Sequence, residues 1–474
     1  MVLLHNSNMP RCITNKLNKG ATMTSVRKFA YPLSRLSLCC ALLAPLSAWA
    51  ATTGCDPTQF GARGDGQTVN TQALQQAIDQ CSQQGGGTVE LGEGVWLSGP
   101  LQLRNDVTLQ LADGSVLQAT NVNKDFVAAF IGAPAQAGEA FILANGVSNV
   151  AITGTGTVDG NGAQDWWPEA MTVRKRVRGG DTDYFKQRFP GVPLANGMPR
   201  PWLIEFNNTQ NARIGGILAT NSPMWNIVIR NSEQVELNGT RVINPEDSPN
   251  SDGVDIVSSR HVTLTHLDID TGDDNVAIKS GLPGLKTTTQ PSQDIVVTRS
   301  IMRRGHGISI GSETANGIRN ISVSHVRFYG TENGVRVKSA RDRGADIGPI
   351  TASHLQMENV ITPILITESY SGQSGIGDGR ISALDSAPIS PTTPYIHDVT
   401  VEYLTATGAK NAGFLSGLPE APLKQITLHQ VNIDASEQGL LTRYVEAAIR
   451  SSKISNQAGE GVVSGPEASL QMLN

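Results

Sequence analysis

Three carboxylates, one imidazole and two cations stand at matching places in a repeated sequence phrase. The phrase contains an apolar pair separated by one residue, and it recurs as NSDGVDIV from 250, GDDNVAIKS from 272, GHGISIGS from 305, NGVRVKS from 333 and TPILITES from 362. Asp252, Asp274 and His306 each fall two residues before their apolar pair, and Asp273 falls one residue earlier. If the pairs stack in neighbouring strands, about 4.8 Å apart, these side chains form one column.

Two cations follow in the fourth phrase. Arg336 and Lys338 flank Val337, which the apolar pattern places inward, so both cationic side chains are expected outward and on the same side of the strand. Residues two apart on a strand are about 7 Å apart. All six groups are therefore expected on a single exposed face.

Taken singly, each of these residues has an ordinary structural explanation. An aspartate before glycine, such as Asp252, is more often a turn residue than a catalyst. A lone histidine is usually structural, cations at strand spacing are typical of a solvated face, and Asp273-Asp274 could cap a turn or hold a cation. The alignment changes this interpretation, because stacked like charges cost free energy and a fold without a use for them tends to avoid them.

Glycoside hydrolysis is the chemistry that needs this layout. One carboxyl group must carry a proton for the leaving oxygen, and another must be ionised to activate water or attack. When carboxyl groups are crowded together, repulsion between like charges raises the pKa of one of them. One group then keeps its proton while another is ionised. The two cations would bind an anionic sugar.

A second basic cluster lies in the segment RKRVRGG, which follows Trp166-Trp167. Either it overhangs the cleft or it is a solvated surface loop. The full chain carries a formal net charge of −5, so attraction of a polyanion must come from a local patch of this kind.

The composition favours a chain with many turns. The 474 residues include 49 glycines and 24 prolines, and only 17 % are charged. The length exceeds that of an ordinary compact domain, so a repeat or elongated fold is expected. The low charge content disfavours long exposed helices and disordered tails.

A second phrase, a polar residue followed by apolar-x-apolar, predicts the fold. It begins at positions 106, 149, 234, 261, 294, 320, 398 and 425, so the offsets from 234 to 320 are 27, 33 and 26 residues. Repeats of this length predict coils that stack on one another. They exclude a barrel of alternating strands and helices, and propeller blades need longer, more regular repeats. We therefore predict an all-β, single-stranded, right-handed parallel β-helix.

One helix is expected before these coils. From Thr71 to Cys81 the run TQALQQAIDQC places its apolar side chains on one face. Asn70 is expected to cap it, and residues 85–87, all glycine, to end it. This helix would cover the open end of the solenoid core.

The N-terminal region is typical of an export signal. Lys28 and Arg35 precede LSLCCALLAPLSAWA, which ends in an A-x-A cleavage site and is too short to span a membrane. Met23 is an alternative start. Cleavage after residue 50 would leave a secreted catalytic domain, 51–474, with 31 basic and 42 acidic residues and a net charge of −11.

The mature chain would keep two cysteines. Cys55 and Cys81 are expected to form a disulfide in an exported protein, and two buried free thiols are the alternative. No metal or other cofactor, nucleic acid or membrane partner is expected, and the chain is expected to be a monomer that acts on a polysaccharide.

Four motifs resemble those of a known family. NSD at 250–252, GDD at 272–274, GHG at 305–307 and RVK at 336–338 resemble the signature motifs of the family 28 polygalacturonases, in their usual order. The resemblance runs from about residue 55 to about residue 370 and looks closest to secreted pectinases of plant-associated Gram-negative bacteria. It implies a right-handed β-helix that hydrolyses the α-1,4 galacturonan backbone of demethylated pectin with inversion.

The resemblance also implies roles for individual residues. Asp273 is implied as the general acid, Asp252 and Asp274 as the pair that activates water, and His306 as the support of the acid's protonation state. The implied substrate-binding residues are Asn250, Arg336, Lys338 and Tyr370.

Several alternatives stay open. Carboxylates one rung apart would suggest retention by the general spacing rule, whereas the resemblance implies inversion. Endo action is favoured because no fused module is visible, but an insertion at about 162–201 could close one end of the cleft and give exo action. The rival functions are a rhamnogalacturonan-type hydrolase, a calcium-dependent pectate lyase and a β-helical adhesin.

Overall fold

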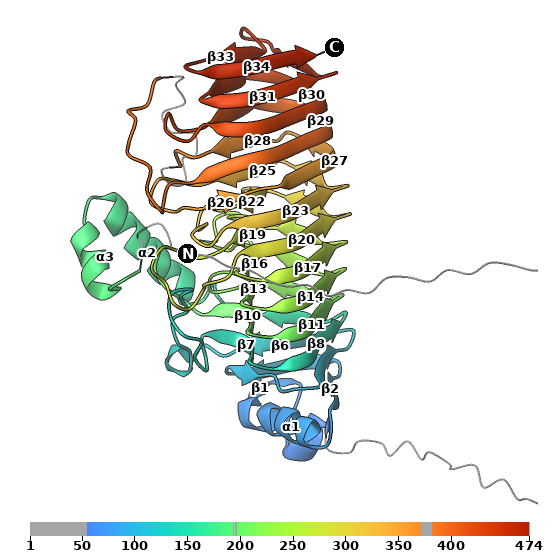
Figure 1. Ribbon diagram of the computed structural model, residues 1–474. Helices are drawn as coiled ribbons and strands as arrows, with labels where there is room; N and C mark the ends of the chain where they lie inside the picture. The colour runs from blue at the N-terminus through green and yellow to red at the C-terminus, as the bar shows by residue number, and fades with distance from the viewer. Residues whose placement is uncertain (1–54, 193, 195–196, 371–381, 474) are drawn as a thin grey trace, which may run out of the picture. The chain divides into compact units, whose positions relative to one another are not determined.

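The repeated phrases fold as parallel strands that stack coil on coil (Figure 1). The computed structural model describes residues 55–192, 194, 197–370 and 382–473, and the predicted signal segment 1–50 lies outside them. The architecture is the predicted right-handed parallel β-helix. Among the described residues, no helix combines the length and apolar character needed to cross a bilayer.

Three parallel sheets make up the walls of the coils. The first sheet contains β4 (Leu101–Gln102), β7 (Ala140–Asn145), β10 (Trp202–Asn207), β13 (Ile227–Arg230), β16 (Val254–Val257), β19 (Val276–Lys279), β22 (Ile308–Ile310), β25 (Asn333–Lys338) and β28 (Thr362–Thr367). The second sheet contains β2 (Gly87–Leu91), β5 (Val107–Leu111), β8 (Ser148–Gly154), β11 (Gln210–Gly215), β14 (Glu233–Asn238), β17 (Arg260–Thr265), β20 (Ser292–Thr298), β23 (Ile318–Ser324) and β27 (Ile350–Glu358).

The third sheet is built from the short strands of each coil. It contains β3 (Gly94–Ser98), β6 (Ser115–Ala119), β9 (Thr157–Asp159), β12 (Leu218–Thr220), β15 (Arg241–Ile243), β18 (Asp268–Asp270), β21 (Ile301–Arg303) and β24 (Arg327–Tyr329). The remaining strands are β1 (Asp65–Val69), β26 (Asp346–Ile347), the long strands β29 (Tyr395–Ser416) and β30 (Leu423–Arg443), and β31 (Val445–Arg450), β32 (Lys453–Asn456), β33 (Val462–Ser464) and β34 (Ala468–Leu473).

The polar residue of the second phrase has a backbone role. It adopts a left-handed conformation at a bend just before or within the first three residues of strands of the second sheet, with φ of 62° at Asp106, 57° at Asn149, 55° at His261 and 56° at Asp294. Asp, Asn and His are the non-glycine residues that tolerate this region best. The recurring phrase is therefore a bend followed by a strand with alternating inward side chains.

The register of the first sheet is the one predicted from the apolar pairs. Val254 pairs with Val276 and Val276 with Ile308, while Ile256, Ile278 and Ile310 align in the next row. These side chains belong to one continuous hydrophobic core that runs through the stack. Each coil thus fixes the position of the next along the strand direction.

The N-terminal end of this core is covered by α1 (Thr71–Gln83), which buries Leu74, Ala77, Ile78 and Cys81 (Figure 1). The predicted helix, and its predicted position over the N-terminal end of the core, are confirmed. The predicted capping role of the Asn70 side chain is wrong. Its amide instead bonds the backbone of Arg63 and Thr68, because the incoming chain turns back beside it.

Cys55 and Cys81 are joined by a disulfide that ties α1 to the chain just before the 3₁₀ turn η2 (Pro57–Phe60). Their sequence separation is 26, so chain-entropy arguments predict that the bond stabilises the cap by about 3 to 4 kcal/mol. We expect Cys55→Ala/Cys81→Ala to lower the midpoint of urea unfolding to the value that the native chain shows under strong reductant. Equal midpoints for the native chain with and without reductant would contradict this expectation.

The insertion at 162–201 contains two helices that were not predicted from the sequence. These are α2 (Trp166–Arg178) and α3 (Thr182–Arg188), which stand off one side of the coils (Figure 1). They bury a small cluster of their own, with Ala170 and Val173 of α2 against Phe185 of α3. The helical pattern of α2 and α3 is weak in the sequence, because so small a core needs only a few apolar side chains. A further short 3₁₀ turn, η3, spans Asn123–Asp125.

Candidate active site

The carboxylates and the imidazole lie at the start of consecutive strands of the first sheet. Asp252 precedes β16, Asp273 and Asp274 precede β19, and His306 precedes β22. Backbone bonds hold these starts in register, since Gly253 N–H donates to the Asp274 carbonyl and His306 N–H donates to the Asp273 carbonyl, both at 2.9 Å. The column predicted from the spacing is therefore formed.

Asp274 is paired with both predicted cations. The Arg336 guanidinium donates to Oδ1, and the Lys338 ammonium donates to Oδ2 at 2.8 Å. Ser309, which lies opposite Arg336 in the register, donates to Oδ1 at 2.9 Å. Ser309 and Ala277 are small, so the arginine can extend back across two strands to the carboxylate.

The predicted exposure of this face is wrong. Asp252, Asp273 and Asp274 are 3 %, 9 % and 2 % exposed, and Arg336 and Lys338 are 1 % and 5 % exposed. Burying an unpaired charge is costly, whereas burying matched pairs is far less so. The side chains therefore cover one another, and Arg336 and Lys338 are bound to Asp274 rather than presented to solvent.

The pairing fixes the charge of Asp274. Burial alone would raise its pKa, but the positive charges of Arg336 and Lys338 outweigh burial and hold the pKa of Asp274 well below its ordinary value. Burial lowers the pKa of Lys338, and the charge of Arg336 adds to this effect. Arg336 and Lys338 therefore favour the ionised form of Asp274 and make it a weak base.

Asp273 and His306 form a second pair. Nδ1 of His306 lies 3.0 Å from Oδ1 of Asp273, and Nε2 lies 3.1 Å from Oε2 of Glu332. Burial would lower the pKa of His306, but the charge of Asp273 and the hydrogen bonds to Asp273 and Asp274 raise this pKa to about 10. Burial likewise opposes ionisation of Asp273, yet the imidazolium outweighs it and lowers the pKa of Asp273. In the free site the proton lies on His306, within hydrogen-bond distance of Asp273.

Asp252 has the opposite environment. Burial raises its pKa well above the ordinary value, and the charges of Asp273, Asp255 and Asp274 raise it further. The opposing cation is Lys279, whose Nζ lies 3.6 Å from Oδ2 of Asp252. The three carboxyl groups of the column are therefore inequivalent, as acid and base chemistry requires.

Lys279 is a residue of the site that was not predicted from the sequence. Its ammonium lies 2.7 Å from Oδ1 of Asp255 and 3.8 Å above the Trp225 ring centroid, and the residue is 5 % exposed. Burial opposes its charge, but Asp255, Glu313 and Asp252 outweigh burial and raise the pKa of Lys279 well above the ordinary value. The signal was present: Lys279 stands at an outward position of the phrase GDDNVAIKS, as Lys338 does in its own phrase.

Asn250 and Tyr370 complete a small pocket over these groups. Oδ1 of Asn250 accepts a hydrogen bond of 3.2 Å from Arg174, and Nζ of Lys338 lies 5.3 Å from the Tyr370 ring centroid. The pocket is lined by Trp225, Asn250, Asp252, Asp273, Asp274, Lys279, Ser312, Glu313, Lys338 and Tyr370. The predicted substrate-binding residues are thus brought together with the carboxylates.

The donor set does not suit a metal ion. Asp273, Asp274 and His306 are close enough to form a ligand group. However, both oxygens of Asp274 accept from cations, and the raised pKa of His306 keeps the imidazole protonated. A cation would have to displace these partners and the proton.

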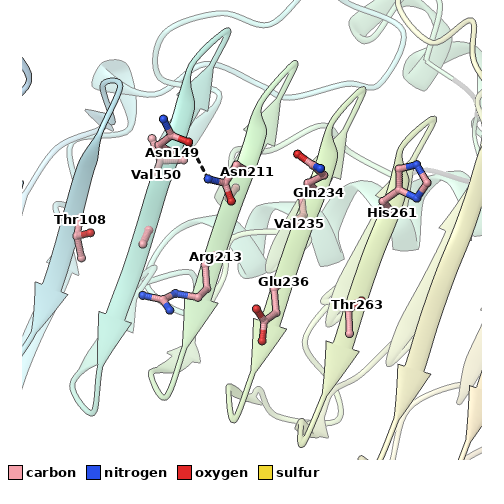
Figure 2. Close-up of a pocket in the computed structure, with 12 residues that line it drawn as sticks. Thr108, Asn149, Val150, Asn211, Arg213, Gln234, Val235, Glu236, His261 and Thr263 are labelled. Atoms are coloured by element: carbon pink, nitrogen blue, oxygen red, sulfur yellow. Dashed lines mark hydrogen bonds between the residues drawn. The ribbon is translucent and has the colours of Figure 1, made fainter. Parts of the chain in front are cut away.

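A larger groove lies elsewhere and lacks this chemistry. It has a volume of about 750 Å³ and lies on the second sheet, where Figure 2 shows side chains from β5, β8, β11, β14 and β17 in a row. Asn149 accepts a hydrogen bond from Asn211 at 2.7 Å. Its lining mixes amides and hydroxyls with Arg213, Glu236 and His261, and it brings no two carboxylates together. The larger volume of this groove therefore does not make it the candidate active site. The buried carboxylate cluster makes the smaller pocket the candidate.

Comparisons with known proteins agree with the geometry. Residues 81–451 match the family model described as "Glycosyl hydrolases family 28". The chain is 33 % identical over 324 residues to an endo-polygalacturonase of Pectobacterium carotovorum subsp. carotovorum. The aligned segment covers 64 % of this chain and 73 % of that enzyme.

Two solved structures are similar as well. An exopolygalacturonase from Thermotoga maritima has a TM-score of 0.66 at 26 % identity, covering 88 % of this chain and 91 % of the other. A polygalacturonase from Erwinia carotovora ssp. carotovora has a TM-score of 0.64 at 28 % identity, covering 80 % and 94 %. The chain belongs to glycosyl hydrolases family 28 and is a glycoside hydrolase.

Proposed function

We propose that this chain hydrolyses α-1,4-galacturonosyl linkages in polygalacturonate, with inversion and in endo mode. The observation that carries the proposal is the buried set of three inequivalent carboxyl groups, each with its own cationic partner. Inverting hydrolysis needs one proton donor and one ionised base. His306 holds the proton beside Asp273, and the ionised forms of Asp252 and Asp274 supply the base. The similarity to polygalacturonases supports the substrate class.

Asp273 is proposed as the general acid, with His306 as its proton reserve. The proton that His306 shares with Asp273 is available to the leaving oxygen once substrate displaces water from the pocket. Glu332, on the other side of the imidazole, favours the protonated ring between turnovers.

Asp252 and Asp274 are proposed to activate the attacking water. The ionised form of Asp274 is favoured and only weakly basic, because two cations and a hydroxyl bind its oxygens. Asp252 is the stronger base once it has lost its proton, because its pKa is raised by burial and by neighbouring carboxylates. Catalysis therefore requires a pH at which Asp252 is ionised.

Lys279 is expected to set the acidic limb of the pH profile. Its charge opposes protonation of Asp252, so Lys279→Met should raise the pKa of that carboxyl. Activity is lost as pH falls through this pKa, and the acidic limb of kcat/KM should move upward by roughly 1 to 3 pH units. Initial rates on polygalacturonate between pH 3 and pH 9 measure the limb.

Two further variants separate this effect from misfolding. Lys279→Met leaves Asp255 buried without its cation, so Lys279→Met/Asp255→Asn removes both charges and should preserve the fold while keeping part of the shift. Lys279→Arg keeps the charge and should leave the limb close to that of the native chain. A folded double variant with an unshifted limb would contradict the role of Lys279.

Digestion of polygalacturonic acid tests the function itself. Random early fragments support endo action, monomer or dimer alone means exo action, and the anomer first released, seen by proton NMR, distinguishes inversion from retention. Activity that persists in a chelator, without an unsaturated product that absorbs in the ultraviolet, excludes a calcium-dependent lyase. Binding without any hydrolysis would favour an adhesin.

Export is part of the proposal. Removal of residues 1–50 would leave Cys55 and Cys81 as the only cysteines, in a compartment where their bond persists. Sequencing the N-terminus of the protein recovered from culture medium tests the cleavage site.

A further inference from the structure

The inserted helix α2 delivers a cation to the edge of the carboxylate cluster. The helix is attached to the coils by Trp167, whose Nε1 donates to the Ser222 carbonyl at 2.9 Å. Arg174 lies seven residues after Trp167, about two helical turns, so it extends from the face of α2 that Trp167 attaches to the coils. Its guanidinium ends at Asn250, two residues before Asp252.

The environment of Arg174 is only partly polar. Nη2 donates to Oδ1 of Asn250 at 3.2 Å, and that oxygen also lies 3.4 Å from Nη2 of the buried Arg200. Arg174 is half-buried, and burial lowers its pKa, while the negative charge of Asp273 acts in the opposite direction. The guanidinium is therefore near the proposed acid without being paired to it.

The other cations of the site already have partners, and the buried Arg200 donates to the backbone carbonyls of Met198, Pro223 and Pro249. Arg336 and Lys338 bind Asp274, and Lys279 binds Asp255 and approaches Asp252. Within residues 55–192, 194, 197–370 and 382–473, no carboxylate oxygen lies within 4.0 Å of an Arg174 nitrogen. A partly desolvated guanidinium without a counter-ion favours an anionic ligand, and its planar fork matches a carboxylate.

We propose that Arg174 binds the carboxylate of a galacturonate unit next to the scissile bond. This inference rests on the proposed function and assigns the uronate contact to the inserted helix α2. Arg336 would have to release Asp274 to make a comparable contact, because the residue is 1 % exposed and its guanidinium is already bound.

Kinetics of the full chain on polygalacturonate test the proposal. Arg174→Ala should raise KM roughly 10- to 100-fold, as expected for loss of one charged contact, with little change in kcat. Lys175→Ala is the matched control, because it removes the same charge from an exposed neighbour on the same helix. An equal KM for the two variants would overturn the proposal.

Binding to an inactive background provides a readout without turnover. In the Asp273→Asn background, calorimetry measures the affinity for trigalacturonate and for its methyl ester. The ratio of these two affinities shows how strongly binding depends on the free carboxylates. Adding Arg174→Ala should reduce that dependence by roughly the same 10- to 100-fold factor, and adding Lys175→Ala should not. A dependence unchanged by Arg174→Ala would overturn the contact. If the native chain does not hydrolyse galacturonan, the proposed function fails; if it does and Arg174→Ala behaves like Lys175→Ala, only this inference fails.

Discussion

Asp273→Asn is expected to abolish turnover of polygalacturonate while the protein stays folded and binds its substrate. The amide cannot carry the proton that His306 shares with the carboxylate, so general acid catalysis is lost. Such catalysis contributes about a hundredfold to ten-thousandfold, and kcat should fall by at least that factor. The amide oxygen can still accept the 2.9 Å hydrogen bond from Asp274 N–H, so the strand start keeps its geometry.

Three measurements on this variant make the result interpretable. Initial rates give kcat, calorimetry with trigalacturonate gives affinity, and thermal unfolding gives stability. Asp113→Asn is the matched control, because it makes the same chemical change at an exposed turn between β5 and β6. Substantial kcat in a folded Asp273→Asn enzyme would remove Asp273 from the acid role.

Arg336→Met is expected to impair both stability and catalysis. Arg336 is 1 % exposed, and its guanidinium is bonded to Asp274 and to Oγ of Ser309, the latter at 2.9 Å, so its removal leaves a buried carboxylate with one cation fewer. Removing one partner of a buried ion pair costs about 3–5 kcal/mol. The pKa of Asp274 should rise, which reduces the ionised pair that activates water. The sequence predicts Arg336 as a substrate-binding residue, and the burial adds an expected loss of stability and of catalysis.

A double variant separates the ion pair from substrate contact. Arg336→Met/Asp274→Asn removes both charges, so part of the lost unfolding free energy should return, while activity should not. Urea unfolding followed by tryptophan fluorescence measures the free energies, and kcat and KM are measured separately. An Arg336→Met enzyme with unchanged stability and kcat but a raised KM would instead place the guanidinium on the substrate.

The sequence by itself determined the fold and which residues stand in the column that precedes the apolar pairs. Each coil repeats a polar bend and an apolar pair, and parallel strands can stack such pairs in only one register without exposing them. Asp252, Asp274 and His306 precede their pairs by the same interval, so their alignment followed from the register. The helix Thr71–Gln83 was equally readable, because its single apolar face covers the end of the core.

The charge state of each group was decided only by the tertiary structure. Whether Arg336 meets water or Asp274 depends on the small side chains of Ala277 and Ser309 in the strands between them, which no spacing rule captures. The pairing of Lys279 with Asp255 and the approach of Arg174 to Asn250 join segments 24 and 76 residues apart. Burial and Coulomb energies depend on these distances in three dimensions, and so the chain order of the carboxylates revealed where the site lies but not which group holds the proton.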